Sequence, residues 1–151
     1  MDQEKKEVVL AIITNKERNV FYMQQKDETY FRTEYRLMFT FFGGKIEDSE
    51  NPNEAIQREL LEEFDSKVAE IIIKNLKFVF SIPYENKKEP KKFQIFESIL
   101  SNEEINLISK TKIKEGKKGL IIKKESIEST QIIPLIKMVL DKYLKLIQKS
   151  K

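Results

Sequence analysis

The sequence predicts an α/β fold in which a mixed β-sheet lies between helices. Short apolar and β-branched runs, which are typical of buried strands, recur along the chain, and two substantial helical stretches interrupt them. The first helix follows Asn51 and the second starts near Pro134. The 151 residues suffice for a sizeable core, and we expect residues 1–151 to form a single domain.

The first part of the chain contains three predicted extended segments. Residues 7–13 (EVVLAII) are a mostly continuous apolar run, and residues 20–24 (VFYMQ) follow a polar turn, so the two are expected to pair as a hairpin. Residues 25–34 form a polar loop that also contains aromatic side chains. Residues 36–42 (RLMFTFF) then lead into Gly43 and Gly44 as another extended segment.

The second part of the chain continues this alternation. Residues 68–73 and 76–83 are β-branched and aromatic runs, as strands usually are, and residues 93–100 form a further predicted strand. Between these strands, residues 84–92 are polar, contain a proline and are expected to be a hairpin loop. Residues 102–108 fit either a short helix or a turn.

The C-terminal stretch is predicted to end the fold with a strand and a helix. Residues 120–122 begin a short strand. Apolar residues then recur at helical spacing after Pro134, namely Ile136, Val139, Leu140, Tyr143 and Ile147. This stripe favours packing against the core over a membrane or partner role.

The helix after Asn51 has the most informative pattern in the chain. Glu59, Glu62 and Glu63 are spaced i, i+3 and i+4, which places them within one sector of about 100° on a helix. An apolar stripe in the adjoining sector can face the core; it consists of Ile56, Leu60 and Phe64. The start of this helix is specified by an N-cap Asn, a Pro at the first position and a Glu at the third.

Three like charges at that spacing destabilise a helix unless they are neutralised. Water and salt screen them if the face is merely exposed, which is the usual situation for such a pattern. A hard divalent cation is the alternative, because Mg²⁺ binds carboxylate oxygens and keeps several of its waters. Two glycines precede the loop that leads to this helix, and glycine allows a backbone group to approach a ligand closely.

The combined pattern resembles the signature of the Nudix hydrolases, enzymes that cleave nucleoside diphosphates linked to another group. Gly44 is followed after five residues by Glu50 and after seven more by the run 58–63, RELLEE. The sequence departs from the family pattern at residues 65–66, where Asp-Ser replaces Gly and an apolar residue. We expect Asp65 to adopt the left-handed conformation with which the family Gly ends the helix.

This resemblance implies a Nudix α/β/α sandwich with a mixed sheet and a magnesium site. The implied Mg²⁺ ligands, for which Mn²⁺ is a substitute, are Glu59, Glu62, Glu63 and the carbonyl of Gly44. Arg58 resembles the structural arginine of the family, and we expect it to pair with Glu50. Glu59 is the favoured general base because it lies beside the implied metal.

Other candidate site residues lie outside this helix. Glu115 precedes Gly116 in a second glycine loop and is either a turn residue, an additional metal ligand or the base. The loop after the second strand often lines the substrate pocket in the family. The candidates for substrate binding are Lys26, Arg32, Arg36 and Phe41.

Composition narrows the chemistry. The chain contains no histidine and no cysteine, which excludes a Ser-His-Asp triad, a thiol nucleophile and any His-containing zinc site. A net charge of +3 without an aromatic-interleaved basic stripe indicates that nucleic acid is not a partner. The N-terminal residues contain no signal-peptide core and no run spans a membrane, so we expect a cytoplasmic protein.

Two classes of function follow from the resemblance. The first is a pyrophosphohydrolase of a nucleoside diphosphate derivative, with nucleoside triphosphates, including damaged ones, as the favoured substrates. Nucleotide sugars, dinucleoside polyphosphates and ADP-ribose are alternatives within this class. The second class is a catalytically silent Nudix-fold sensor that binds a nucleotide. The complete carboxylate set favours the enzyme, and homodimer formation is left open.

Overall fold

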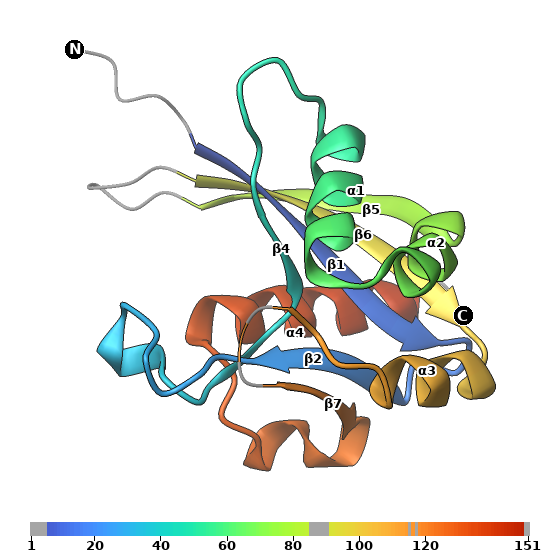
Figure 1. The fold of residues 1–151 in the computed structure, drawn as a ribbon. Coiled ribbons are helices and arrows are strands. Elements are labelled where there is room, and N and C mark those ends of the chain that lie inside the picture. Colours follow the sequence, from blue (N-terminus) through green and yellow to red (C-terminus); the bar gives the residue numbers. More distant parts are fainter. Residues whose placement is uncertain (1–5, 85–90, 115, 117, 150–151) are drawn as a thin grey trace.

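The computed structural model describes residues 6–84, 91–114, 116 and 118–149. These residues form one seven-stranded mixed sheet with helices on both faces, which confirms the predicted sandwich (Figure 1). The strands follow the order β3–β2–β1–β6–β5, and β4 pairs with β1 while β7 pairs with β2.

The central strand is β1 (Lys6–Asn15), and the sheet divides along one of its edges. On the other edge, β1 runs parallel to β6 (Lys91–Leu100) over its whole length. On the dividing edge, residues 8–11 pair with β4 (Phe42–Lys45), whereas only Ile13 and Thr14 pair with β2 (Val20–Gln25). The predicted hairpin of β1 and β2 is therefore present, and β2 and β4 diverge from each other because they pair with different parts of β1.

The remaining strands extend the sheet at both sides. β3 (Phe39–Thr40) and β7 (Lys118–Lys123) pair with β2, and β5 (Leu76–Tyr84) pairs antiparallel with β6. The strands predicted over residues 76–83, 93–100 and 120–122 are confirmed. The hairpin loop predicted over residues 84–92 lies for the most part outside the described residues.

The helices are α1 (Pro52–Glu63), α2 (Ser66–Lys74), α3 (Asn102–Ser109) and α4 (Pro134–Lys149), with short 3₁₀ segments at Thr33–Tyr35 and Lys124–Ser129. The extended structure suggested for residues 68–73 is wrong, because this segment is α2. Val68, Ala69 and Ile72 form a helical stripe that is buried in the core. Packing of that stripe outweighs the strand propensity of the individual side chains.

The junction between α1 and α2 also differs from the prediction. Asp65 has φ of −63°, so it is not left-handed, and its side chain accepts a 3.0 Å hydrogen bond from the Val68 amide. Asp65 is thus the N-cap of α2. Phe64 ends α1 in an extended conformation, with φ of −113°. A new helix therefore starts at the position where the family pattern has glycine.

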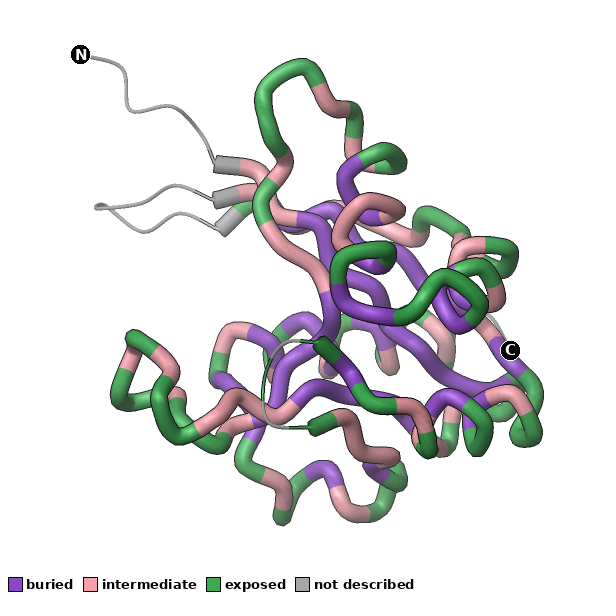
Figure 2. Tube along the Cα trace, viewed as in Figure 1, coloured by how far each residue is buried: buried purple, intermediate pink, exposed green. Residues whose placement is uncertain are grey.

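The core consists of two apolar layers, one on each face of the sheet. Figure 2 shows the buried residues along the strands and on the helices that cover them. Val9, Ala11 and Ile13 of β1 point into the layer beneath α1, α2 and α3, and Leu10 and Ile12 point into the layer beneath α4. Burial on both faces explains why β1 is a continuous apolar run. The two layers hold α1 and α4 on opposite sides of the dividing sheet.

Candidate active site

The carboxylate-bearing helix is fixed at its start and along one side. The Asn51 side chain accepts from the Glu54 amide at 2.8 Å, and the Glu54 carboxylate accepts from the Asn51 amide at 3.0 Å. This capping box satisfies amides that would otherwise lack partners. Ile56, Leu60 and Phe64 are fully buried, as predicted. The rotation of α1 about its axis is therefore fixed, and with it the direction of its glutamates.

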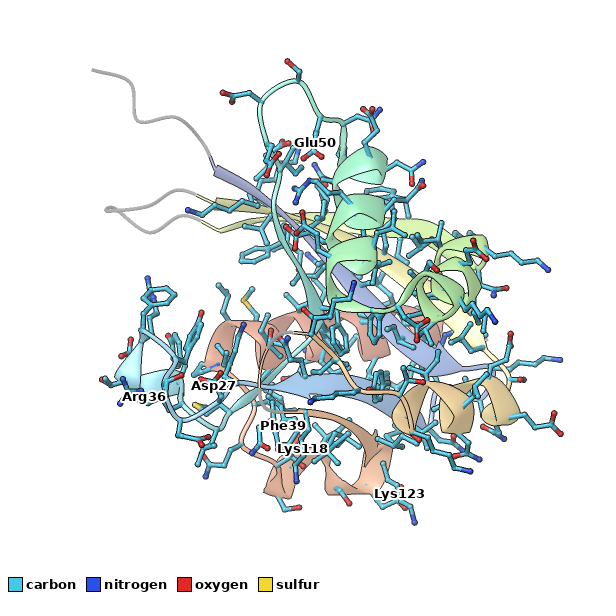
Figure 3. The ribbon with its side chains drawn as sticks, in the orientation of Figure 1. Asp27, Arg36, Phe39, Glu50, Lys118 and Lys123 are labelled. Carbon is cyan, nitrogen blue, oxygen red and sulfur yellow. The ribbon has the colours of Figure 1, made fainter. Side chains whose placement is uncertain are left out.

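Arg58 joins α1 to the loop that precedes it. Its Nε donates to Glu50 Oε2 at 2.7 Å and its Nη2 donates to Glu50 Oε1 at 3.0 Å, so the expected pair is present and bidentate. Nη2 also donates to the carbonyl of Lys45 at 3.0 Å. Hydrogen bonding from Arg58 lowers the pKa of Glu50, and the same bonds raise the pKa of Arg58. Figure 3 shows Glu50 beside α1.

The three glutamates of α1 differ in burial and in their partners. Arg58 Nη1 donates to Glu59 Oε1 at 3.1 Å and to Glu62 Oε1 at 3.3 Å. Glu63 is only 6% exposed, and its Oε1 accepts from Gln24 Nε2 of β2 at 3.2 Å. The carboxylates thus range from half-exposed to buried, and each has a donor that partly offsets the repulsion among them.

The two glycines of β4 allow close approaches on both of its sides. A Cβ atom added at Gly44 would lie 2.3 Å from Glu59 Oε1, so the absence of a side chain leaves room for that carboxylate. A Cβ atom at Gly43 would lie 1.9 Å from the carbonyl oxygen of Val9, and Gly43 has φ of +152°. Gly43 therefore permits the pairing with β1, and Gly44 permits the contact with α1.

The residue types at this site fit a divalent cation. Glu59, Glu62 and Glu63 offer only oxygen ligands, and the space beside Gly44 admits a carboxylate next to the backbone. Within the part of the chain that the structure describes, no three acidic side chains converge closely enough to hold a metal ion. Arg58 and Gln24 hold these carboxylates instead.

A cavity of about 270 Å³ opens where β2 and β4 diverge from each other beside β1. Three of the predicted substrate-binding residues line it, namely Lys26, Arg32 and Phe41, and so do Gly43 and Gly44. Arg36 is not among the described lining residues, because its Nε donates to the Tyr30 carbonyl at 2.8 Å within the loop. Figure 3 shows Arg36 with Asp27 in this loop.

Several residues of the cavity were not predicted from the sequence. They include Gln24, Tyr30, Tyr35, Thr40 and the residues of the first turn of α4 and just before it, Ile133, Leu135 and Ile136. Gln24 had one signal in the sequence, since it follows the apolar run of β2, and the structure shows that it is buried. The contribution of α4 depends on tertiary packing, which no local pattern reveals.

The predicted role of Glu115 falls on a residue outside those that the structure describes. Its neighbours lie close to the carboxylate site. The Lys114 amide donates to the Glu63 carbonyl at 2.9 Å, and a Cβ atom at Gly116 would lie 3.0 Å from the Gln24 side chain. The second glycine loop therefore runs beside Glu63 and Gln24.

Tyr22 lies beneath the site with an unusual hydroxyl group. Its ring stacks on Phe42 with centroids 5.5 Å apart, and its buried hydroxyl has no hydrogen-bond partner among the described residues. Burial and, secondarily, the negative charge of Glu63 raise the pKa of Tyr22 to about 12. The hydroxyl is close to Gly119, where an added Cβ atom would lie 1.9 Å away.

Comparisons of the sequence with known proteins identify a family and one curated relative. The family model described as the NUDIX domain matches residues 4–135. The chain is 34% identical over 70 residues to an 8-oxo-dGTP diphosphatase of Proteus vulgaris, and the match covers 46% of this chain and 59% of that relative. The chain therefore matches little more than half the length of this curated relative.

Solved structures share the fold at low sequence identity. A MutT protein from Methanosarcina mazei Go1 has a TM-score of 0.68 at 15% identity, covering 100% of this chain and 99% of that one. A mutT/nudix family protein from Listeria innocua has a TM-score of 0.70 at 12% identity, with 99% and 98% covered. The NUDIX domain of Shewanella oneidensis NrtR, complexed with ADP ribose, gives 0.68 at 8%, with 97% and 90% covered.

The chain belongs to the Nudix hydrolase family, because the family model spans most of its length. Among the described residues, no helix has both the length and the apolar character needed to cross a membrane.

Proposed function

We propose that the chain is a Mg²⁺-dependent hydrolase that cleaves the diphosphate linkage of nucleoside triphosphates, including damaged ones. The observation that carries this proposal is the position of Glu59 and Glu63. Glu59 lies against Gly44 and Glu63 is bonded to Gln24, and both Gly44 and Gln24 line the cavity. A substrate in the cavity would thus extend toward the carboxylates. The name of the Proteus vulgaris relative, 8-oxo-dGTP diphosphatase, supports this choice of substrate.

The residues of α1 and β4 have distinct roles in this proposal. Glu59, Glu62, Glu63 and the Gly44 carbonyl would hold Mg²⁺ or Mn²⁺, which polarises the diphosphate and makes the attacking water more acidic. Arg58 and Glu50 hold the loop against the helix, and Gln24 orients Glu63. Glu59 is the favoured proton acceptor for the attacking water, and Glu115 is the rival.

A nucleotide sensor without catalysis is the second candidate, and one observation favours it. Arg58 Nη1 donates to both Glu59 Oε1 and Glu62 Oε1. These hydrogen bonds occupy carboxylate oxygens that a metal ion would need as ligands. A sensor would bind nucleotides with this arrangement intact. Nucleotide sugars, dinucleoside polyphosphates and ADP-ribose are the other substrates within the hydrolase proposal. A cytoplasmic location and the absence of nucleic-acid partners stay predictions, and homodimer formation stays open.

A substrate panel tests the proposal. The chain is incubated with Mg²⁺ and nucleoside triphosphates, 8-oxo-dGTP, ADP-ribose, nucleotide sugars and dinucleoside polyphosphates. Phosphate, pyrophosphate and nucleoside monophosphate are measured separately, because only the triphosphates release phosphate or pyrophosphate. We expect pyrophosphate and a nucleoside monophosphate from triphosphates. Binding without release of either product from any compound would favour the sensor.

A further inference from the structure

The cavity beside the carboxylates has an uneven distribution of polar groups. Its described lining contains two cations, Lys26 and Arg32, and no carboxylate. Its other walls are largely apolar and include Leu10, Phe93 and Ile136. A ligand group that fits here has a flat apolar body and an edge with hydrogen-bond acceptors. A nucleobase meets this description better than a phosphate does, since a phosphate has no apolar surface to bury.

Both cations belong to one internally braced loop. The loop closes where the Lys26 amide donates to the Met38 carbonyl at 2.9 Å and the Leu37 amide donates to the Lys26 carbonyl at 3.0 Å. Arg36 Nε donates to the Tyr30 carbonyl at 2.8 Å across its interior. These bonds hold the loop as a compact unit, so its charged side chains project from a defined backbone.

Aromatic rings support the two charged groups. Lys26 Nζ lies 4.6 Å from the centroid of the Tyr30 ring, and Arg32 Cζ lies 5.8 Å from that of Tyr35. Among the described residues, the ion pair of the Arg32 guanidinium is a long one with Glu34, at 3.9 Å, between two side chains that are 42% and 58% exposed. Such an exposed pair is weak, so the guanidinium can donate to a ligand.

One end of the cavity adjoins the carboxylates and the other adjoins the loop with Lys26 and Arg32, so a nucleobase would lie at the loop. Gly44 and Gln24 form the end that adjoins the carboxylates, whereas the loop lies on the side of β4 away from α1 (Figure 1). This step rests on the proposed function, which puts the diphosphate at the carboxylates. The volume of about 270 Å³ is close to the lower end of the roughly 300–1,000 Å³ of ligand pockets, which suits one base.

We propose that Arg32 and Lys26 make this cavity selective for nucleobases that present keto oxygens over bases that present an amino group at the same place. Guanine offers O6 and N7 and thymine offers O4 as acceptors, whereas adenine and cytosine present N6 and N4 amino donors there. Lys and Arg are donors only, so they pair with the first group and oppose the second. Guanine and thymine or uracil nucleotides are therefore the preferred substrate class.

The test compares kcat/KM for dGTP, dTTP, dATP and dCTP, because all four carry the same triphosphate. One good donor–acceptor pair corresponds to a preference of about tenfold or more for the keto bases. Arg32→Met keeps most of the apolar stem and should remove most of this preference. Arg32→Glu replaces donors with acceptors and should shift the ratio toward dATP and dCTP. Lys67→Met, on the exposed face of α2, is the charge-matched control and should leave the ratio unchanged.

The same four nucleotides are also titrated without Mg²⁺, with binding measured by calorimetry and folding of each variant checked by melting temperature. If keto bases bind preferentially in this titration but no nucleotide is hydrolysed when Mg²⁺ is present, the proposed hydrolase activity is overturned and the base selectivity stands. Hydrolysis without base preference would overturn the selectivity alone. An equal loss for all four nucleotides in Arg32→Met would show that Arg32 binds phosphate, which also overturns the inference.

Discussion

Alanine substitutions at the two adjacent glycines of β4 should separate folding from activity. At Gly43, an added Cβ atom would lie 1.9 Å from the Val9 carbonyl oxygen, and φ is +152°. The β1–β4 ladder must then open by about 1 Å in a closely packed sheet. At Gly44, the added atom would lie 2.3 Å from Glu59 Oε1, at the end of a flexible side chain. The first clash has to be relieved by the backbone, and the second by one carboxylate.

The expected magnitudes differ accordingly. Backbone strain and overpacking in Gly43→Ala should cost about 2–5 kcal/mol of unfolding free energy, which lowers the melting temperature by roughly 5–15 °C. Gly44→Ala should change stability by no more than about 1 kcal/mol. Displacement of the Glu59 carboxylate by about 1 Å should nevertheless reduce kcat by about 10²-fold. Urea denaturation and the pyrophosphate-release assay measure the two effects.

Both variants are measured side by side, so that each is the control for the other. The reasoning is refuted if Gly44→Ala loses as much stability as Gly43→Ala, because the contact with Glu59 would then be a structural one. Full activity in a folded Gly44→Ala protein would equally show that the position of Glu59 does not matter for catalysis.

Three further predictions concern the tyrosines and Arg58. Tyr22→Phe should be neutral or stabilising in urea denaturation because its hydroxyl has no partner among the described residues, whereas Tyr143→Phe should cost about 1–3 kcal/mol because the hydroxyl donates to the buried Glu97 carboxylate. Burial raises the pKa of Tyr22 to about 12 and also raises the pKa of Tyr143, so on raising the pH the unfolded chain loses these protons before the folded one does. The free energy of unfolding should therefore be intact below about pH 10 and decline above it, less steeply in Tyr22→Phe. An unchanged alkaline slope in Tyr22→Phe would argue against burial as the cause. Arg58→Lys keeps the charge but loses the bidentate bond to Glu50, so both melting temperature and kcat should fall, and an unaltered melting temperature would count against the pairing.

Local patterns in the sequence were sufficient for the elements that hold the carboxylates. The N-cap of α1, its buried stripe and the eight-residue spacing of Glu50 and Arg58 all depend on residues close in the chain, and all three are present. The strand predictions succeeded for a similar reason, since β1 is apolar on both faces. Short-range geometry therefore determines α1 and the pairing of Arg58 with Glu50.

Features that depend on distant contacts were missed. Residues 68–73 have strand-like side chains, but the hydrophobic layer beneath α1 stabilises them as a helix. Arg36, a candidate for substrate binding, donates to the Tyr30 carbonyl of its own loop, a hydrogen bond that the side-chain types alone did not indicate. The apolar wall that α4 contributes to the cavity is over 90 residues away from the loop that faces it. None of these relations has a signature in the sequence near the residues concerned.

The central claim is that α1 holds a catalytic divalent cation, and a Mg²⁺ titration of the double variant Glu62→Gln/Glu63→Gln tests it most directly. In the unaltered chain, Mg²⁺ should raise the melting temperature and support pyrophosphate release. In the double variant both responses should vanish, while the metal-free melting temperature stays equal or rises because like charges are removed. Glu70→Gln, on the exposed face of α2, controls for the loss of a carboxylate. A double variant that keeps full activity and its Mg²⁺-dependent stabilisation would contradict the assignment of the site.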